Sequence, residues 1–157
     1  MREVCERMKG MDIIADYDKR AHQCCVHMNY PEAIEWLQKA LAISEESLGR
    51  EHSTTEALYN NTAAVLEEQG DFSGAVLWYK KALAICEKRH GANHWLAAGY
   101  HGSIADAYKV QREFTEALAW YRKALAVYEK TYGAANPSTM AMRDAIAAMA
   151  DNTRRDL

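Results

Sequence analysis

The heptapeptide AHQCCVH at residues 21–27 holds the side chains that are most capable of chemistry. Its thiols and imidazoles are groups that bind zinc or take part in redox reactions. On a helix, His22 and Cys25 share one face, whereas His27 lies about 140° round from His22 at 100° per residue. Because two ligands cannot complete a four-coordinate structural site, we expect neither a metal ion nor a cofactor here. A zinc content near one ion per chain would overturn this expectation.

The four cysteines are Cys5, Cys24, Cys25 and Cys86, an even number that could suggest disulfides. Adjacent Cys24 and Cys25 are poor partners for one another, and a helical chain of this length needs no covalent staples. We therefore expect free, buried thiols, with Cys24 at a core position of its helix.

The remaining candidates for catalysis are weak. His90 and His94 are four residues apart, but Gly91 lies between them and interrupts the helix, so the two imidazoles need not share a face. No glycine-rich phosphate loop, no nucleophile on a strand–turn–helix and no pair of carboxylates in an apolar pocket is recognisable. The sequence predicts a protein that is not an enzyme.

Charge and hydropathy argue against several classes of partner. The net charge is −3 over 157 residues, and no cluster of Lys and Arg is long enough to follow a phosphate backbone. No apolar run approaches the roughly 20 residues that cross a bilayer. The first ten residues, MREVCERMKG, lack the apolar core of a secretory signal. We expect a cytoplasmic protein that binds neither nucleic acid nor membrane.

A seventeen-residue phrase occurs three times at a spacing of 42 residues. It reads AIEWLQKALAISEESLG at residues 33–49, AVLWYKKALAICEKRHG at 75–91 and ALAWYRKALAVYEKTYG at 117–133. Its apolar residues recur every three to four positions, as on one face of a helix, and the segment before each copy has the same spacing. With only two prolines and eight glycines, the composition also favours helix. Each unit is therefore predicted to be a helical hairpin.

Local signals mark the ends of these helices. The tetrapeptide STTE at residues 53–56 predicts a capping box at the start of a first helix, and Asn29 and Asp71 are suited to cap second helices. Three glycines suit the left-handed conformation that ends a helix: Gly49, Gly91 and Gly133.

Two sets of recurring residues are predicted to pack the hairpins. Small side chains let helices approach one another closely, and they recur at Ala21, Ala63, Ala105, Ala33, Ala75 and Ala117. The second set is the column Trp36, Trp78 and Trp120. This column is open to two interpretations, a ladder that stacks a ligand or packing of one hairpin against the next, and we favour packing.

The units share a small residue, a bulky residue three positions later, and an alanine–tyrosine–alanine series in the second helix. These residues are Ala63, Leu66 or Tyr108, Ala75, Tyr79 and Ala82. The pattern resembles the tetratricopeptide repeat, and its 42-residue period is similar to that of kinesin light chains and many bacterial signalling proteins. The resemblance covers about residues 12–151. It implies an all-α fold, a right-handed α-solenoid of three tetratricopeptide-type helical hairpins plus a C-terminal capping helix.

We predict a single domain over residues 1–157, with repeats at about 12–52, 54–94 and 96–136 and a capping helix at about 138–151. The cap would cover the apolar end of the stack with Met142, Ile146 and Met149, while Arg143, Asp144 and Asp151 face water. Residues 1–7 align with the end of a second helix. They are interpreted as the tail of a preceding helix, which would make this chain a segment of a longer array.

In tetratricopeptide arrays the first helices line a concave groove, and the resemblance implies the same arrangement here. The predicted partner-binding residues are Asp18, His22, Cys25, Asn60, Asn61, Ala64, Glu67, Gly102, Asp106 and Lys109. The groove and cap hold six acids and one lysine: Asp18, Glu67, Glu68, Asp106, Asp144, Asp151 and Lys109. A concave surface of one sign attracts partners of the other. We therefore predict a non-enzymatic scaffold or adaptor that binds a basic peptide or helix; the alternative, that these acids are only a solvated surface, stays open.

Other functions of such scaffolds were weighed on the same positions. Arrays that clamp the carboxylate of a chaperone tail use Lys, Asn, Asn, Lys and Arg, whose counterparts here are Asp18, His22, Asn61, Gly99 and Ser103. Only Asn61 matches, so a chaperone tail is not expected as partner. A different class of function is a self-associating structural element, such as a homodimer, or a regulatory segment of a larger multidomain signalling protein. The apolar ends of a short solenoid could pair across a two-fold axis.

Overall fold

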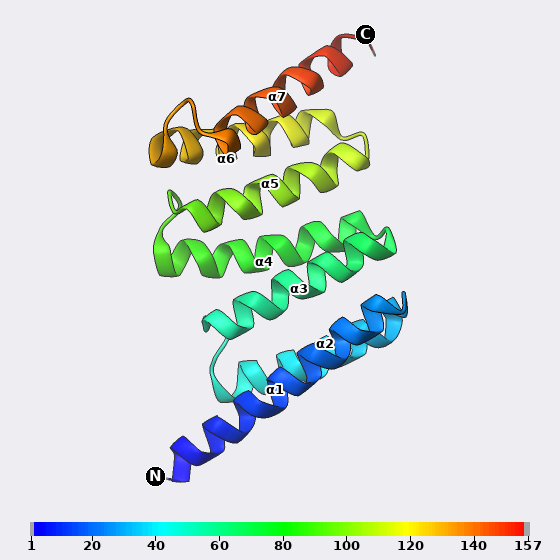
Figure 1. Cartoon of the computed structure of the whole chain (residues 1–157), viewed down its shortest axis with the longest axis vertical. Helices are drawn as coiled ribbons and strands as arrows, with labels where there is room; N and C mark the ends of the chain where they lie inside the picture. The colour runs from blue at the N-terminus through cyan, green and yellow to red at the C-terminus, as the bar shows by residue number, and fades with distance from the viewer. Residues whose placement is uncertain (1, 156–157) are drawn as a thin grey trace. The chain divides into compact units, whose positions relative to one another are not determined.

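The computed structural model describes the backbone of residues 2–155 and the side chains of residues 8–150. Within this part of the chain, all regular structure is α-helical (Figure 1). The seven helices are α1 (Arg2–Val26), α2 (Tyr30–Ser47), α3 (Ser53–Gln69), α4 (Phe72–His90), α5 (Trp95–Val110), α6 (Phe114–Tyr132) and α7 (Pro137–Arg155). The predicted all-α fold of paired helices is confirmed.

The chain divides into two compact units, Met1–Ile85 and Cys86–Leu157, with the boundary inside α4. In unit 1, α1 packs against α2, and α2 packs against α3. In unit 2, α5 packs against α6, and α6 packs against α7. Figure 1 shows α1 with α2 and α5 with α6 as hairpins. The description of the whole chain as one domain with the repeat bounds given above stays a prediction.

Alanine occupies the close contacts within each unit. The six recurring alanines are 0–2% exposed: Ala21, Ala33, Ala63, Ala75, Ala105 and Ala117. A methyl group is small enough to let two helix backbones approach, and the larger side chains on either side then interdigitate. The predicted packing role of these alanines is confirmed.

The glycines that follow second helices have the predicted left-handed backbone. The φ angles of Gly49, Gly91 and Gly133 are +97°, +91° and +81°. The turn inside each hairpin also needs a positive φ, at Met28, Gly70 and Arg112, which are spaced by 42 residues. Only Gly70 adopts this conformation without a Cβ penalty, so Met28 and Arg112 are strained.

First helices are capped one residue earlier than predicted. His52 is the N-cap of α3, and its Nδ1 accepts a hydrogen bond from the Thr54 backbone N–H at 3.1 Å. The capping box at residues 53–56 is therefore wrong, because Ser53 already lies inside the helix. His94 caps α5 in the same way, accepting from the Leu96 N–H at 3.3 Å.

The two predicted caps of second helices behave differently. Asp71 caps α4, since its Oδ1 accepts from the Gly74 N–H at 2.9 Å. Asn29 occupies the N-cap position of α2 but makes no side-chain cap hydrogen bond. Its amide nitrogen instead donates to Glu32 Oε2 at 2.6 Å. The prediction is confirmed for Asp71 and wrong for Asn29.

Helix α1 begins at Arg2, well before the predicted start of the first repeat near residue 12. Residues 2–7 therefore continue into α1, and their interpretation as the tail of a separate helix is wrong. No proline interrupts this stretch, and Gly10 lies where an added Cβ would be 3.2 Å from Ser47 Oγ of α2. The side chain of Cys5 lies outside the described residues.

The tryptophan column packs within hairpins rather than between them. Each ring contacts an aromatic ring on the first helix of its own hairpin, at centroid distances of 5.2 Å (Tyr17–Trp36), 5.4 Å (Tyr59–Trp78) and 5.5 Å (His101–Trp120). A lysine lies over each indole, with Nζ at 4.2, 3.8 and 3.9 Å for Lys39, Lys81 and Lys123. The preference for packing between hairpins is corrected, because the partner ring comes from the same repeat.

Helix α7 covers one end of unit 2 as predicted. Met149 is 5% exposed and joins a cluster with Ala105, Ala117 and Tyr121, against which Met142 and Ile146 also pack. Arg143 and Asp144 are exposed. The Asp151 side chain lies outside the described residues.

Candidate functional site

Unit 1 has a hollow of about 600 Å³ between the first helices of its two hairpins. Its lining residues are Ala15, Asp18, Lys19, Ala21, His22, Cys25 and Val26 of α1, Leu37 of α2, and Asn61, Ala64, Val65 and Glu68 of α3. Among the predicted partner-binding residues, the structure brings together Asp18, His22, Cys25, Asn61 and Ala64. The hollow is an arrangement of side chains that can accept a ligand.

A hydrogen bond across the hollow joins its two walls. Asn61 Nδ2 donates to Asp18 Oδ1 at 2.8 Å, linking α3 to α1 over 43 residues of sequence. A carboxylate can accept more than one hydrogen bond, so Asp18 keeps capacity for a donor from a partner. Glu68 is exposed on the α3 wall, and Lys19 and His22 are exposed on the α1 wall.

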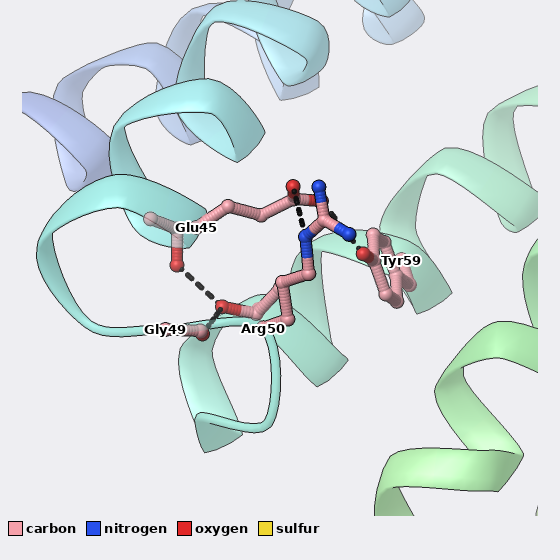
Figure 2. A network of polar contacts seen from close by, with 6 residues as sticks. Glu45, Gly49, Arg50 and Tyr59 are labelled. Carbon is pink, nitrogen blue, oxygen red and sulfur yellow. Dashed lines mark hydrogen bonds and ion pairs between the residues drawn. The ribbon is translucent and has the colours of Figure 1, made fainter.

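The end of α2 and the start of α3 are fixed by a polar network (Figure 2). The Tyr59 hydroxyl donates to Glu45 Oε1 at 2.7 Å, and Arg50 Nε donates to Glu45 Oε2 at 3.1 Å. Burial, followed by the contact with Glu45, raises the pKa of Tyr59 to about 12. Close by, the Thr55 hydroxyl donates to the Gly49 carbonyl at 2.8 Å. This network ties α3, and thus one wall of the hollow, to α2.

The thiols of α1 lie in different surroundings. Cys25 lines the hollow, and burial followed by the charge of Glu68 raises its thiol pKa. Such a thiol is protonated at neutral pH and is a weak nucleophile. Cys24 is half-buried, so its predicted place in the core is wrong. It lies two residues before the end of α1, where it lines a separate shallow hollow with Asn29 and Trp36.

No disulfide joins the cysteines whose side chains the structure describes. Among these same described residues, no group of three His, Cys, Asp or Glu side chains is arranged to hold a metal ion. Chemistry at the hollow therefore comes from hydrogen bonding, charge and apolar contact.

Two other predicted residues of unit 1 lie outside the lining of the hollow. Glu67 Oε2 accepts from the Tyr79 hydroxyl of α4 at 2.8 Å, so this carboxylate is held within its own hairpin. Asn60 is half-buried on α3. The charge of Glu67 is thus less accessible than the sequence suggests.

The predicted residues of unit 2 form a separate cluster on α5. Asp106 Oδ1 accepts from Lys109 Nζ at 2.8 Å and also from the Tyr121 hydroxyl of α6. Burial, followed by the hydrogen bond to Asp106, raises the pKa of Tyr121 to about 12. The hydrogen bond to Asp106 also raises the pKa of Lys109. Because Lys109 offsets Asp106, this part of α5 contributes little net negative charge; Gly102 is buried.

Sequence reasoning missed the tyrosines that hold these acids. Tyr79 and Tyr121 occupy the same position 42 residues apart, and the first repeat has Leu37 there. A hydroxyl at this position reaches an acid of the first helix, whereas Leu37 cannot form that bond. The signal was the departure of Leu37 from a recurring tyrosine.

Two family models, both described as tetratricopeptide repeat, match residues 14–88 and 102–138. No curated protein is a match for the sequence. None of the described helices combines the length and apolar character needed to cross a membrane.

Solved structures share the fold at low sequence identity. Repeats described as "kinesin light chain nearly identical TPR-like repeats", from Podosopora anserina, are 23% identical, with a TM-score of 0.71 over 87% of this chain and 64% of that chain. BtubC (BKLC) from P. vanneervenii is 21% identical, with a TM-score of 0.71 over 90% of this chain and 62% of that one. This chain thus spans less than two thirds of either protein.

A shorter structure matches as well. The N-terminal domain of stress-induced protein-1 (STI-1) from C. elegans is 16% identical, with a TM-score of 0.69 over 89% of this chain and 96% of that chain. Such identities speak for the shared fold. Together with the two sequence matches and the paired helices of both units, they show that the chain belongs to the tetratricopeptide repeat family.

Proposed function

We propose that this chain is a non-catalytic protein-binding module whose partner segment enters the hollow between α1 and α3. Membership of the tetratricopeptide repeat family implies interaction with other proteins. The observation that supports this site is the hollow itself, about 600 Å³ in volume. This volume lies within the range of ordinary ligand pockets, roughly 300–1,000 Å³.

The lining of the hollow suits a side chain with an apolar stem and a polar end. Ala15, Leu37, Ala64 and Val65 supply apolar surface. Apolar walls with a few polar groups are typical of binding sites, because the walls provide affinity and the polar groups fix orientation. A lysine or arginine of a partner has this amphipathic character.

Charge supports a partner with basic character. The hollow has two carboxylates, Asp18 and Glu68, against the ammonium of Lys19. The proposal therefore rests on unit 1 rather than on the whole set of acids, since Asp106 in unit 2 is paired with Lys109. A carboxylate within a concave surface attracts a cation and disfavours an acidic segment.

The test is binding of labelled peptides of equal length that are basic, acidic or neutral, measured by fluorescence anisotropy at two salt concentrations. We expect the basic peptides to bind, and the variant Glu68→Lys to weaken binding by about tenfold or more, equivalent to about 1.4 kcal/mol. Glu35→Lys is the matched control, because Glu35 is exposed on α2 and does not line the hollow.

The control separates a site from a general charge effect. Equal weakening by Glu35→Lys would show that net charge alone attracts the peptide. Failure of all basic peptides to bind would contradict the proposed partner class. Asp106 is less suitable for such a reversal, because its replacement also removes the contacts with Lys109 and Tyr121.

A further inference from the structure

Each second helix ends with a glutamate that contacts the next first helix, 14 residues later. The glutamates are Glu45, Glu87 and Glu129, and their partners in the same order are Tyr59, His101 and Arg143. The partner is thus a neutral phenol, an imidazole and a permanent cation at one repeat position. Of the three, only His101 changes charge near neutral pH.

His101 is held in surroundings that favour its neutral form. Its side chain is 7% exposed, and Nε2 lies 3.7 Å from Glu87 Oε1 of α4, beyond hydrogen-bond distance. Nδ1 is buried and has no hydrogen-bond partner. A protonated ring carries an N–H at both nitrogens, so protonation would create a buried donor without an acceptor.

The charged groups that face His101 act in opposite directions. Burial lowers the pKa of His101, the Glu87 carboxylate works against this lowering, and the Lys123 ammonium of α6 adds to it. Lys123 Nζ lies 3.9 Å from the centroid of Trp120, whose other neighbour is the His101 ring at 5.5 Å. A cation at His101 would therefore be buried near a second cation.

The N-cap of the same helix also depends on a neutral imidazole. His94 Nδ1 accepts from the Leu96 N–H, and a protonated Nδ1 cannot accept. The His90 ring of α4 stacks on His94 at 4.6 Å, which places a second titratable ring beside the cap. In α7 the corresponding cap is Asn136, whose Oδ1 accepts from the Ser138 N–H at 2.9 Å at any pH in this range.

We propose that α5 is an acid-sensitive element of unit 2, which loses its N-cap and its contact with the end of α4 when His94 and His101 are protonated. In unit 1, α3 has a histidine cap, His52, but Tyr59 at the position of His101. It therefore has one such histidine where α5 has two. This inference is independent of the hollow in unit 1, so either can fail alone.

The direction of the effect follows from proton linkage. A buried histidine that binds its proton more weakly in the folded than in the unfolded state stabilises the fold fully above its ordinary pKa of about 6.5. This stability is lost as the pH falls below that value. One pH unit below it, each such histidine can reduce protection by up to about tenfold.

The experiment is hydrogen exchange of the whole chain at pH 7.5 and pH 5.5, read by mass spectrometry and corrected for intrinsic exchange rates. We expect protection of α5 to fall several-fold at pH 5.5, and more than that of α3. The chain itself supplies matched replacements, since His94→Asn copies the cap of α7 and His101→Tyr copies the partner of Glu45. The double variant should keep its α5 protection within about twofold between the two pH values.

Two results would overturn the proposal. One is equal protection of wild-type α5 at both pH values, and the other is the same acid loss in the double variant as in wild type. Should the double variant not fold, an NMR titration of the His101 ring in the wild-type protein decides. A folded-state pKa below 6.5 supports acid sensitivity, and a value at or above 6.5 overturns it.

Discussion

The first and third repeats use the same positions to build opposite kinds of surface. At the position of Leu37, the third repeat has Tyr121, whose hydroxyl donates to Asp106 beside Lys109. The third repeat thus has a polar cluster between its two helices, whereas Leu37 and Cys25 line an open hollow in unit 1. The comparison teaches that the recurring residues make the scaffold and that departures from the repeat make the site.

The largest expected effect tests whether the scaffold is the same in both units. Ala75→Leu in unit 1 and Ala117→Leu in unit 2 should each cost about 1–3 kcal/mol by overpacking, because both alanines are 0% exposed. Thermal unfolding measures this cost, with Ala84→Leu, an exposed position of α4, as control. An unchanged midpoint in either core variant would contradict the equivalent packing of the two units.

The second prediction converts the open site into the filled kind. The double variant Cys25→Glu, Leu37→Tyr transfers the Glu67–Tyr79 pair of the second repeat to the first. It should occupy the hollow and weaken binding of a basic peptide by about tenfold or more, that is by about 1.4 kcal/mol. The control Cys25→Ser, Leu37→Met keeps similar volumes and should bind as wild type. Undiminished binding by the filled variant would place the peptide elsewhere.

The third prediction concerns the hydroxyls that hold groove acids. Tyr79→Phe and Tyr121→Phe each remove one hydrogen bond to a carboxylate and should cost about 1 kcal/mol in the free energy of unfolding. Denaturant unfolding measures the two variants side by side. A clearly smaller cost for Tyr121→Phe would show that Lys109 alone can hold Asp106.

Alkaline pH provides a related test. The pKa of Tyr121 is raised to about 12, so the unfolded chain loses this proton first, at its ordinary pKa near 10. Stability from Tyr121 is therefore complete below pH 10 and is lost as the pH rises from 10 towards 12. Tyr121→Phe should reduce the slope of stability with pH in this window, relative to wild type.

The smallest expected effect lies at the hairpin turns. Arg112→Gly and Met28→Gly should stabilise the fold by about 0.5–1 kcal/mol, because glycine adopts their φ values of +64° and +56° without a Cβ penalty. Gly70→Ala should destabilise it, since Gly70 has the same turn conformation. Thermal midpoints that fall in the glycine variants would show that the side chains of Met28 and Arg112 contribute more than their strain costs.

Local features were predictable because they depend on residues close in sequence. The helices, the left-handed Gly49, Gly91 and Gly133, and the Asp71 cap follow from spacing and from backbone preference. The 42-residue period then aligned Asp18 of α1 and Asn61 of α3 on facing walls. Long periodic patterns therefore carried the fold and the position of the hollow.

Contacts between helices were harder to predict, because a repeat position specifies a face but not which atoms meet. The hydrogen bond from Tyr79 to Glu67 and the pairing of Lys109 with Asp106 reduce the accessible negative charge, and neither follows from spacing alone. The choice of His52 over Ser53 as N-cap likewise depends on where an imidazole nitrogen lies relative to a backbone N–H.

The measurement that tests the central claim most directly is an NMR titration of the isotope-labelled chain with a basic peptide. The account predicts saturable shifts of backbone amides at residues 15–26 and 61–68, the two walls of the hollow, and their loss in the Cys25→Glu, Leu37→Tyr variant. Shifts confined to the second helices α2, α4 and α6, or shifts that persist in the filled variant, would contradict it.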